Sequence, residues 1–152
     1  FELKNELLNI RPANEDDVSL LAEFIRGLAE YEKLSDEVVA DEAILRESFF
    51  GNRPSAEALI AEWEEKPAAF AVFFENFSTF KGRSGLYLED IYVEPEAVEV
   101  TDEMLEDQLD NLRERRFCSD FCCPELEVSL VVYCCRENRR VDRLLDWQAL
   151  AC

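Results

Sequence analysis

The stretch Gly85 to Glu96, with the sequence GLYLEDIYVEPE, decides the fold of this chain. Large apolar and aromatic residues dominate it, and such residues are enriched in strands. The pattern predicts a strand from Gly85 to Val93 with Leu86, Leu88 and Ile91 in the core. An acidic pair, Glu89 and Asp90, interrupts the apolar run. An acidic pair on a strand is in most proteins part of the solvated surface.

Outside this strand, hydrophobic spacing and turn residues divide the chain into alternating elements. Strands are predicted at 7–10, 58–63, 68–74 and 125–133, and helices at 14–28, 41–50, 102–116 and 139–151. This order predicts a mixed α/β fold, a three-layer sandwich, formed by one domain over 1–152. We expect six apolar residues to be buried together: Phe24, Phe70, Val72, Leu86, Leu88 and Ile91.

The hydrophobic content and the net charge of the chain limit the kinds of partner that it can bind. The chain has 152 residues, of which 48% are hydrophobic, so a packed core is expected. No apolar run reaches the roughly 18 residues that a membrane span requires. Asp and Glu number 35 against 16 Lys and Arg, which gives a net charge of −19. Such a chain repels nucleic acid and anionic lipid and attracts polyamines or a basic protein surface, although the acids also suit a well-solvated surface.

Histidine is absent, so proton transfer near neutral pH requires a carboxylate with a shifted pKa, Cys, Lys or the substrate's own amine. All six cysteines lie in the last third, at positions 118, 122, 123, 134, 135 and 152. Their spacing does not match a zinc site, and we predict no metal. Free thiols are expected. Disulfides involving Cys122, Cys123, Cys134 or Cys135 are the alternative in an oxidising compartment.

Four segments carry a family resemblance: Ile10–Ala13, Leu28–Lys33, the hairpin Phe77–Asp90 and the strand Gly85–Glu96. Together they resemble the GNAT superfamily of N-acetyltransferases, in the branch that acetylates diamines and polyamines such as spermidine and spermine. The resemblance covers residues 7–96, and residues 97–152 diverge. It implies a GNAT-like α/β/α sandwich, here expected to lack the last strands. It also implies an intracellular, reducing compartment, the cytoplasm or an organelle matrix.

In that family an amine attacks the thioester of acetyl-CoA, and the resemblance implies acceptor-side roles for two groups of residues. Glu89 and Asp90 match the family's acidic pair near the acceptor amine. Tyr31, Glu32 and Phe80 are expected to line the same pocket. Aromatic packing explains Tyr31 and Phe80 equally well.

The donor side departs from the family pattern. A turn of the form Arg/Gln-x-x-Gly-x-Gly/Ala normally binds the pyrophosphate. Here the matching residues are Val98, Glu99, Val100, Thr101, Asp102 and Glu103, without a glycine or a cation. Acids at a helix N-terminus repel a phosphate, and they also satisfy the helix dipole. The family's tyrosine on the last helix, which protonates the thiolate, is absent, because Leu145 or Trp147 occupies that position.

Two hypotheses follow. The first is a degenerate acetyltransferase fold that is not an enzyme, needs no cofactor and serves as a binding or structural subunit of a larger assembly. A protein partner or a homodimer would then cover residues 126–135. The alternative is an active N-acetyltransferase that uses acetyl-CoA and acts on a small basic amine. The altered donor loop favours the first hypothesis, and it predicts that acetyl-CoA does not bind.

Overall fold

The computed structural model describes residues 7–80, 82–97, 99–117, 129–130, 132–134 and 139–141. Five strands form one sheet in the order β1-β2-β3-β4-β5. Their bounds are β1 Leu8–Pro12, β2 Glu57–Trp63, β3 Lys66–Ser78, β4 Arg83–Val93 and β5 Ser129–Leu130. The first four strands are antiparallel neighbours, and β5 pairs with β4 in parallel. Strands β6 Val132–Cys134 and β7 Arg139–Val141 form a separate antiparallel pair.

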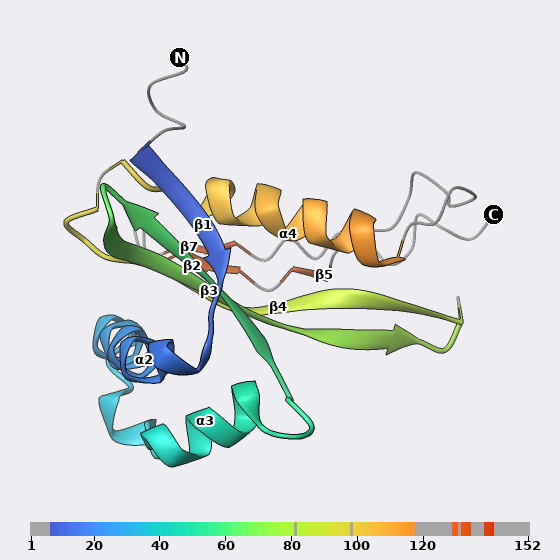
Figure 1. Cartoon of the computed structure of the whole chain (residues 1–152), viewed down its shortest axis with the longest axis horizontal. Coiled ribbons are helices and arrows are strands. Elements are labelled where there is room, and N and C mark those ends of the chain that lie inside the picture. The colour runs from blue at the N-terminus through green and yellow to red at the C-terminus, as the bar shows by residue number, and fades with distance from the viewer. Residues whose placement is uncertain are drawn as a thin grey trace.

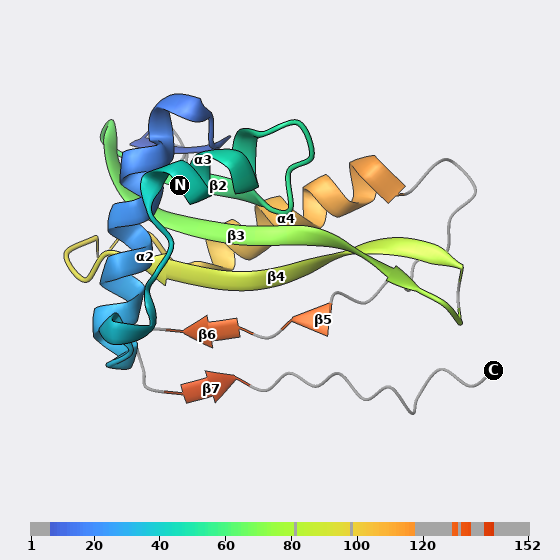
Figure 2. The same cartoon turned by 90° about the horizontal axis from the view of Figure 1, so that it is seen from below.

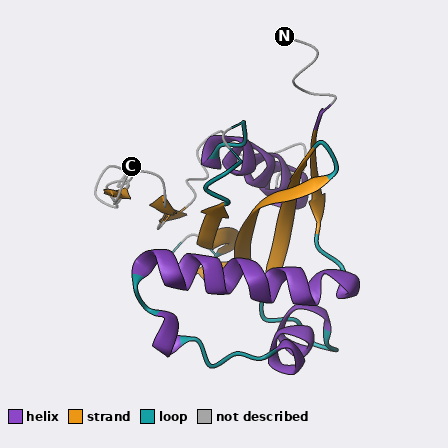
Figure 3. Ribbon diagram, turned by 90° about the vertical axis from the view of Figure 1, so that its left-hand side faces the viewer, coloured by secondary structure: helices purple, strands orange, loops and turns teal. Residues whose placement is uncertain are grey.

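Helices cover both faces of the sheet, which makes three layers (Figure 1). Helices α2 (Val18–Glu32) and α3 (Glu42–Phe50) lie on one face, and α4 (Asp102–Phe117) lies on the other, as the side view in Figure 3 also shows. Short 3-10 helices precede α2 (η1, Glu15–Asp17) and α3 (η2, Ser35–Glu37). The mixed α/β, three-layer prediction is confirmed. No helix in the described part of the chain is long and apolar enough to cross a membrane.

Helix starts follow the cap residues in the sequence. Asn14 accepts a hydrogen bond from the Asp16 backbone N–H and forms a capping box with Asp17, which starts η1 and leads into α2. Asp41 caps α3 by accepting from the Ile44 N–H at 2.9 Å. Each cap satisfies an N–H that the first helical turn cannot pair internally.

The apolar residues divide into two cores, one on each face of the sheet. Phe24 of α2 packs with Phe70 and Val72 of β3 in the core between the sheet and helices α2 and α3. Leu86, Leu88 and Ile91 of β4 lie in the other core, between the sheet and α4. All six are buried, as predicted, but the expectation that they are buried together is wrong. Successive strand residues point to opposite faces, so a single apolar list cannot define one core.

A β-bulge in β4 changes the register at the acidic pair. Val72 on β3 pairs with Asp90, and the next residue, Phe73, pairs with Leu88, so Glu89 is one residue extra on β4. Paired residues share a face, and Asp90 therefore lies on the α2 face with Val72. The bulge also lets Leu88 and Ile91, three residues apart, enter the same core.

The C-terminal third differs from the prediction where the structure describes it. Residues Arg139–Val141 form β7 and pair with Val132–Cys134, so a helix starting at Arg139 is wrong. Over so few residues, strand pairing outweighs the helical spacing of the later apolar residues. The predicted helix beyond Val141, and half of the segment 126–135, lie outside the described residues.

Arg11 on β1 joins three elements through its guanidinium. It donates to Asp17 Oδ2 at 2.7 Å and Oδ1 at 2.9 Å, and its Nε donates to Glu62 Oε1 on β2 at 3.0 Å. Asp17 is buried at 8% exposure. The hydrogen bonds from Arg11 hold the pKa of Asp17 below its usual value. This bidentate pair anchors the start of α2 to the sheet.

We expect Arg11→Met to lower the free energy of unfolding at pH 7 by about 2 kcal/mol, because Asp17 then stays buried without its cation. A depressed carboxyl pKa stabilises the fold above the unfolded value of 3.8, and this stability is lost as pH falls through the folded pKa. The loss of unfolding free energy caused by Arg11→Met should therefore be smaller at pH 3 than at pH 7. Denaturant unfolding of both proteins at the two pH values measures this loss.

Arg46→Met is the matched control, because Arg46 pairs with Glu15 at 3.6 Å on the exposed surface. Its expected cost is below about 0.5 kcal/mol. Equal costs for the two variants would refute the role given to Arg11.

Candidate active site

A cavity of 470 Å³ opens where the C-terminal ends of α2 and β4 meet the start of α4. These segments lie together at one end of the sheet (Figure 1). The size lies within the range of pockets for small molecules and cofactors. The lining residues are Gly27, Glu30 and Tyr31 from α2, Ile91, Tyr92 and Val93 from β4, Pro95 after it, and Val100, Thr101 and Asp102 at the start of α4.

The α4 end of the cavity presents a helix N-terminus. Val100, which is fully buried, anchors the turn before the helix, and its N–H bonds the Ala97 carbonyl at 3.2 Å. Thr101 and Asp102 follow and line the cavity. The first N–H groups of a helix have no partner inside it, and together with the helix dipole they attract anions.

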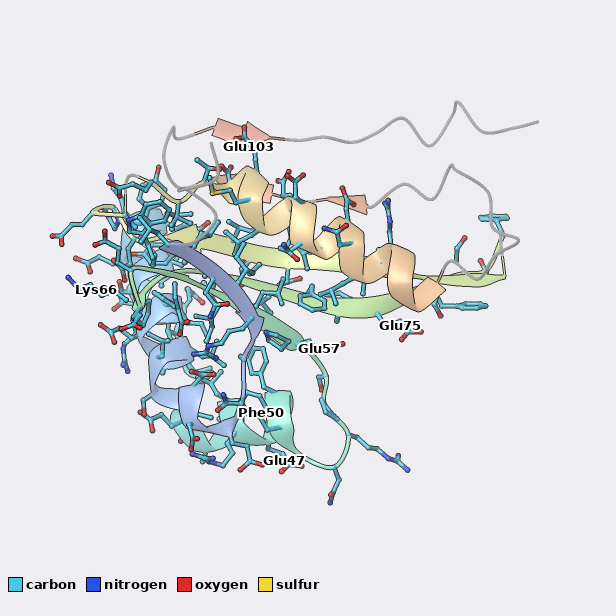
Figure 4. The ribbon with its side chains drawn as sticks, turned by 45° about the horizontal axis from the view of Figure 1, so that its top comes forward. Glu47, Phe50, Glu57, Lys66, Glu75 and Glu103 are labelled. Atoms are coloured by element: carbon cyan, nitrogen blue, oxygen red, sulfur yellow. The ribbon has the colours of Figure 1, made fainter. Side chains whose placement is uncertain are left out.

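The acids of the predicted pyrophosphate loop do not all face the cavity. Asp102 is half-buried and lines it, whereas Glu99 and Glu103 are exposed and do not. Figure 4 shows Glu103 on the outer side of the first turn of α4, pointing away from the sheet. Val98 lies outside the described residues. The expectation that three acids oppose a bound phosphate therefore holds for Asp102 alone among the described lining residues.

Three acids lie near enough to interact electrostatically where α2 ends, although none of them is among the residues that line the cavity. Asp90 is half-buried on β4, Glu89 is its exposed neighbour, and Glu32 ends α2. Burial, together with the negative charges of Glu89 and Glu32, raises the pKa of Asp90 to about 6. A carboxyl with a pKa near neutrality can exchange a proton at physiological pH. Histidine usually has this role, and the chain contains none.

The structure brings some predicted acceptor residues together and separates another. Tyr31 lines the cavity, and the charge of Glu32 acts on Asp90, but neither Glu32 nor Asp90 is among the lining residues. Phe80 instead lies in the turn between β3 and β4, at the far end of the sheet, and is 93% exposed (Figure 2). Within one chain, Phe80 does not join Tyr31 and Glu32. No group of three or more Cys, Asp or Glu side chains among the described residues is arranged to hold a metal.

A contact between Gly27 and Tyr92, which the sequence did not predict, forms part of the cavity wall. Gly27 lies in the middle of α2, and a Cβ built there would be 2.6 Å from the Tyr92 hydroxyl oxygen. Tyr92 is buried, and its hydroxyl donates to Glu94 Oε2 at 3.4 Å. A glycine inside an otherwise amphipathic helix was the available signal, because it usually marks close packing.

We expect Gly27→Ala to destabilise the fold by about 1–3 kcal/mol, although alanine is the better helix former, because the added methyl displaces Tyr92. Tyr92→Phe removes the clashing oxygen, so the double variant should cost less than the sum of the single variants. Thermal or denaturant unfolding measures this coupling. Ser19→Ala, on the exposed side of the same helix, is the control with an expected change near zero. Additive costs would contradict the contact.

Sequence comparison relates part of this chain to curated acetyltransferases. No protein-family model matches the sequence. The thialysine N-epsilon-acetyltransferases of Bos taurus and Sus scrofa are 43% and 42% identical to it over 95 residues. Each match covers 57% of this chain and 55% of the relative. The chain thus matches about half the length of these curated relatives.

Solved acetyltransferases share the fold. An aminoglycoside acetyltransferase from an uncultured soil sample superposes with a TM-score of 0.61 at 14% identity, over 86% of this chain and 79% of that one. A predicted acetyltransferase from Clostridium acetobutylicum, solved with acetyl-CoA, superposes with a TM-score of 0.57 at 19% identity. The superposition covers 84% of this chain and 80% of that one. The chain has the GNAT acetyltransferase fold. The sequence resemblance to diamine and polyamine acetyltransferases is likewise confirmed, because the curated relatives are thialysine acetyltransferases.

These relatives correct the first functional hypothesis. A degenerate GNAT fold that acts only as a binding or structural subunit is contradicted, since the relatives at 39–43% identity are named for acetyltransferase activity. The expectation that no cofactor is used has no support, and a GNAT neighbour was solved with acetyl-CoA. The lack of glycines in the loop leaves the helix N-terminus at α4 in place, and Asp102 is the one acid among the described loop residues that lines the cavity.

Proposed function

We propose that this protein is an N-acetyltransferase that uses acetyl-CoA and acts on a small basic amine. The observation that carries the proposal is the position of the cavity. It has the N-terminus of α4 at one end and Glu30 of α2 at the other, and Glu32 and Asp90 are next in sequence to the lining residues Tyr31 and Ile91. One end therefore suits an anionic donor and the other a cationic acceptor.

The residues of the cavity fit acetyl-CoA in part. Val93 and Pro95, which are not fully buried, offer apolar surface to a flexible thioester arm, and the first turn of α4 offers N–H groups to phosphate oxygens. Asp102 works against phosphate binding, because like charges repel strongly where water is partly excluded. We therefore expect weak binding of the donor rather than none.

Asp90 and Glu32 supply the acceptor chemistry in this proposal. Together they attract an ammonium group, and Asp90 takes its proton, directly or through water. When bound, acetyl-CoA supplies an activated acetyl group. The neutral amine would then attack this group, so that a C–N bond forms as the C–S bond breaks, and the proton that the amine nitrogen loses would leave with the thiolate as the free thiol of CoA. The curated relatives are named for acetylation of the epsilon nitrogen of thialysine, and a terminal primary amine beside a second charged group is the substrate class we propose here.

Blocking the cavity tests the proposal. Thr101→Phe places a ring at the α4 end of the cavity and should abolish saturable binding of acetyl-CoA in titration calorimetry at low salt. Asp107→Phe, on the exposed surface of the same helix, should leave binding intact. Binding that is equal in both variants, or absent from the parent protein, would contradict the proposed site.

A further inference from the structure

Two aromatic rings meet across the strands of the β3–β4 hairpin, and we call Phe74 and Tyr87 the aromatic pair. The two residues are opposite each other in the strand register, and their ring centroids are 4.9 Å apart at an interplanar angle of 32°. Both side chains are half-buried, and neither belongs to the two apolar cores that the described residues form. The aromatic pair therefore retains ring surface that packing within the cores does not use.

The aromatic pair lies on the same face of the sheet as Asp90. Phe73 and Leu88, the strand partners next to the pair, belong to the core under α4. Successive strand residues point to opposite faces, so the aromatic pair faces the α2 side. Asp90 faces this side as well, because it is paired with Val72 of the α2 core. Figures 1 and 2 show the hairpin extending beyond α2 in this direction.

Asp90 lies between the aromatic pair and the cavity along β4. Val72, the strand partner of Asp90, is two residues from Phe74 on β3, which places the two cross-strand pairs about 7 Å apart. On the other side of Asp90, Ile91 and Tyr92 line the cavity. An acceptor whose reacting nitrogen lies at the carboxylate can therefore extend its other end over the rings.

Ring faces next to carboxylates favour a cation. The face of an aromatic ring is electronegative, so it binds ammonium and quaternary ammonium groups, and more strongly where water is partly excluded. Glu32 and Glu89 act electrostatically on Asp90, which adds negative charge at this end of the pair. An anionic ligand would be repelled, and a neutral apolar ligand would gain nothing from these charges. The combination favours a ligand with two cationic groups.

We propose that Phe74 and Tyr87 determine specificity for the acceptor by binding its second cationic group, the one that is not acetylated, while the reacting ammonium lies at Asp90. This inference rests on the proposed function, because it assigns a further part of the same acceptor. It selects amines whose two cationic groups are about 7 Å apart. It also favours a quaternary ammonium as the second group, because such a group binds well to ring faces and has no N–H to acetylate.

Titration calorimetry with two amines, in the absence of acetyl-CoA, tests the proposal. The first is (4-aminobutyl)trimethylammonium, and the second is 5,5-dimethylhexylamine, which has the same shape with a neutral tert-butyl end. We expect the parent protein to bind the first about tenfold more tightly or better. Phe74→Leu/Tyr87→Leu should reduce this preference by about fivefold or more, because it removes the ring faces while the charge of the protein and its apolar surface remain.

Three variants serve as controls. The exchange Phe74→Tyr/Tyr87→Phe retains both rings and should retain the preference. Phe77→Leu removes a ring that is 64% exposed on the opposite face of the same hairpin, and it should also retain the preference. Asp90→Asn should weaken the binding of both amines alike, because both carry the primary ammonium. Circular dichroism verifies that each variant is folded.

Three results would overturn the proposal: a preference that the double leucine variant leaves unchanged, an equal loss of affinity for both amines in that variant, or no saturable binding of the trimethylammonium amine by the parent protein. A failure of the proposed function is distinguishable, because it would appear as absent acetyl transfer by a protein that still binds this amine through its rings.

Discussion

Replacing Asp90 with Asn is expected to slow acetyl transfer about 100-fold while making the fold more stable. The rate falls because the carboxylate that takes the proton from the ammonium is lost, and general base catalysis contributes on this order. Steady-state rates against pH measure it. In the parent protein, the rate should decline as pH falls through about 6, the pKa to which burial and the neighbouring acids raise Asp90.

The stability gain follows from the same pKa. Because the folded pKa of Asp90 is raised above 3.8, the folded state binds more protons than the unfolded state between about pH 4 and 6. Stability therefore decreases as pH rises through this window. Asp90→Asn should raise the free energy of unfolding by about 1–3 kcal/mol at pH 7.5 and by almost nothing below pH 4.

Glu75→Gln, which removes a charge from an exposed position on β3, is the control for Asp90→Asn. It should change neither the rate nor the stability appreciably. A variant Asp90→Asn that is slower and also less stable would indicate that Asp90 is structural, and the role as a proton acceptor would then be lost.

Replacing Asp102 with Asn is expected to lower the KM for acetyl-CoA by about tenfold, with kcat and the KM for the amine unchanged. Asp102 lines the cavity at the start of α4, so removing its charge strengthens the attraction of the helix N-terminus for phosphate. The helix loses about 0.5 kcal/mol of favourable dipole interaction in exchange.

Asp107→Asn, exposed one turn further along α4, is the matched control and should leave the KM for acetyl-CoA within about twofold. Kinetics at several donor concentrations separate the two variants. An unchanged or higher KM in Asp102→Asn would place the donor phosphates elsewhere.

The fold was predictable where the sequence repeats a pattern over many residues. The α2 stripe through Val18, Leu21, Phe24 and Leu28 lies as expected, and the strand predicted at 85–93 is part of β4, Arg83–Val93. The sorting of apolar residues into two cores was not predictable, because the bulge at Glu89 shifts the alternation by one residue. Strand β7 was missed since its pairing with β6 depends on tertiary structure.

The site was predictable only in part, for a similar reason. Asp90 and Glu32 could be proposed from the resemblance, but burial sets the pKa of Asp90, and burial follows from the packing of α2 on β4. The Gly27–Tyr92 contact joins residues far apart in the chain, so a glycine inside α2 indicates close packing but does not show which residue packs there. The acids at 99–103 suggested a lost donor site, because the sequence does not show which of them face the cavity.

The most direct test of the central claim is acetyl transfer itself. The full chain is incubated with acetyl-CoA and either thialysine or a short diamine, and the acetylated amine and free CoA are quantified by mass spectrometry. We predict that both products form in equal amounts, with many turnovers per protein and a rate that falls below pH 6 and in Asp90→Asn. A well-folded protein that yields no acetylated amine above the uncatalysed background, at saturating donor and over a range of amines, would contradict the proposal.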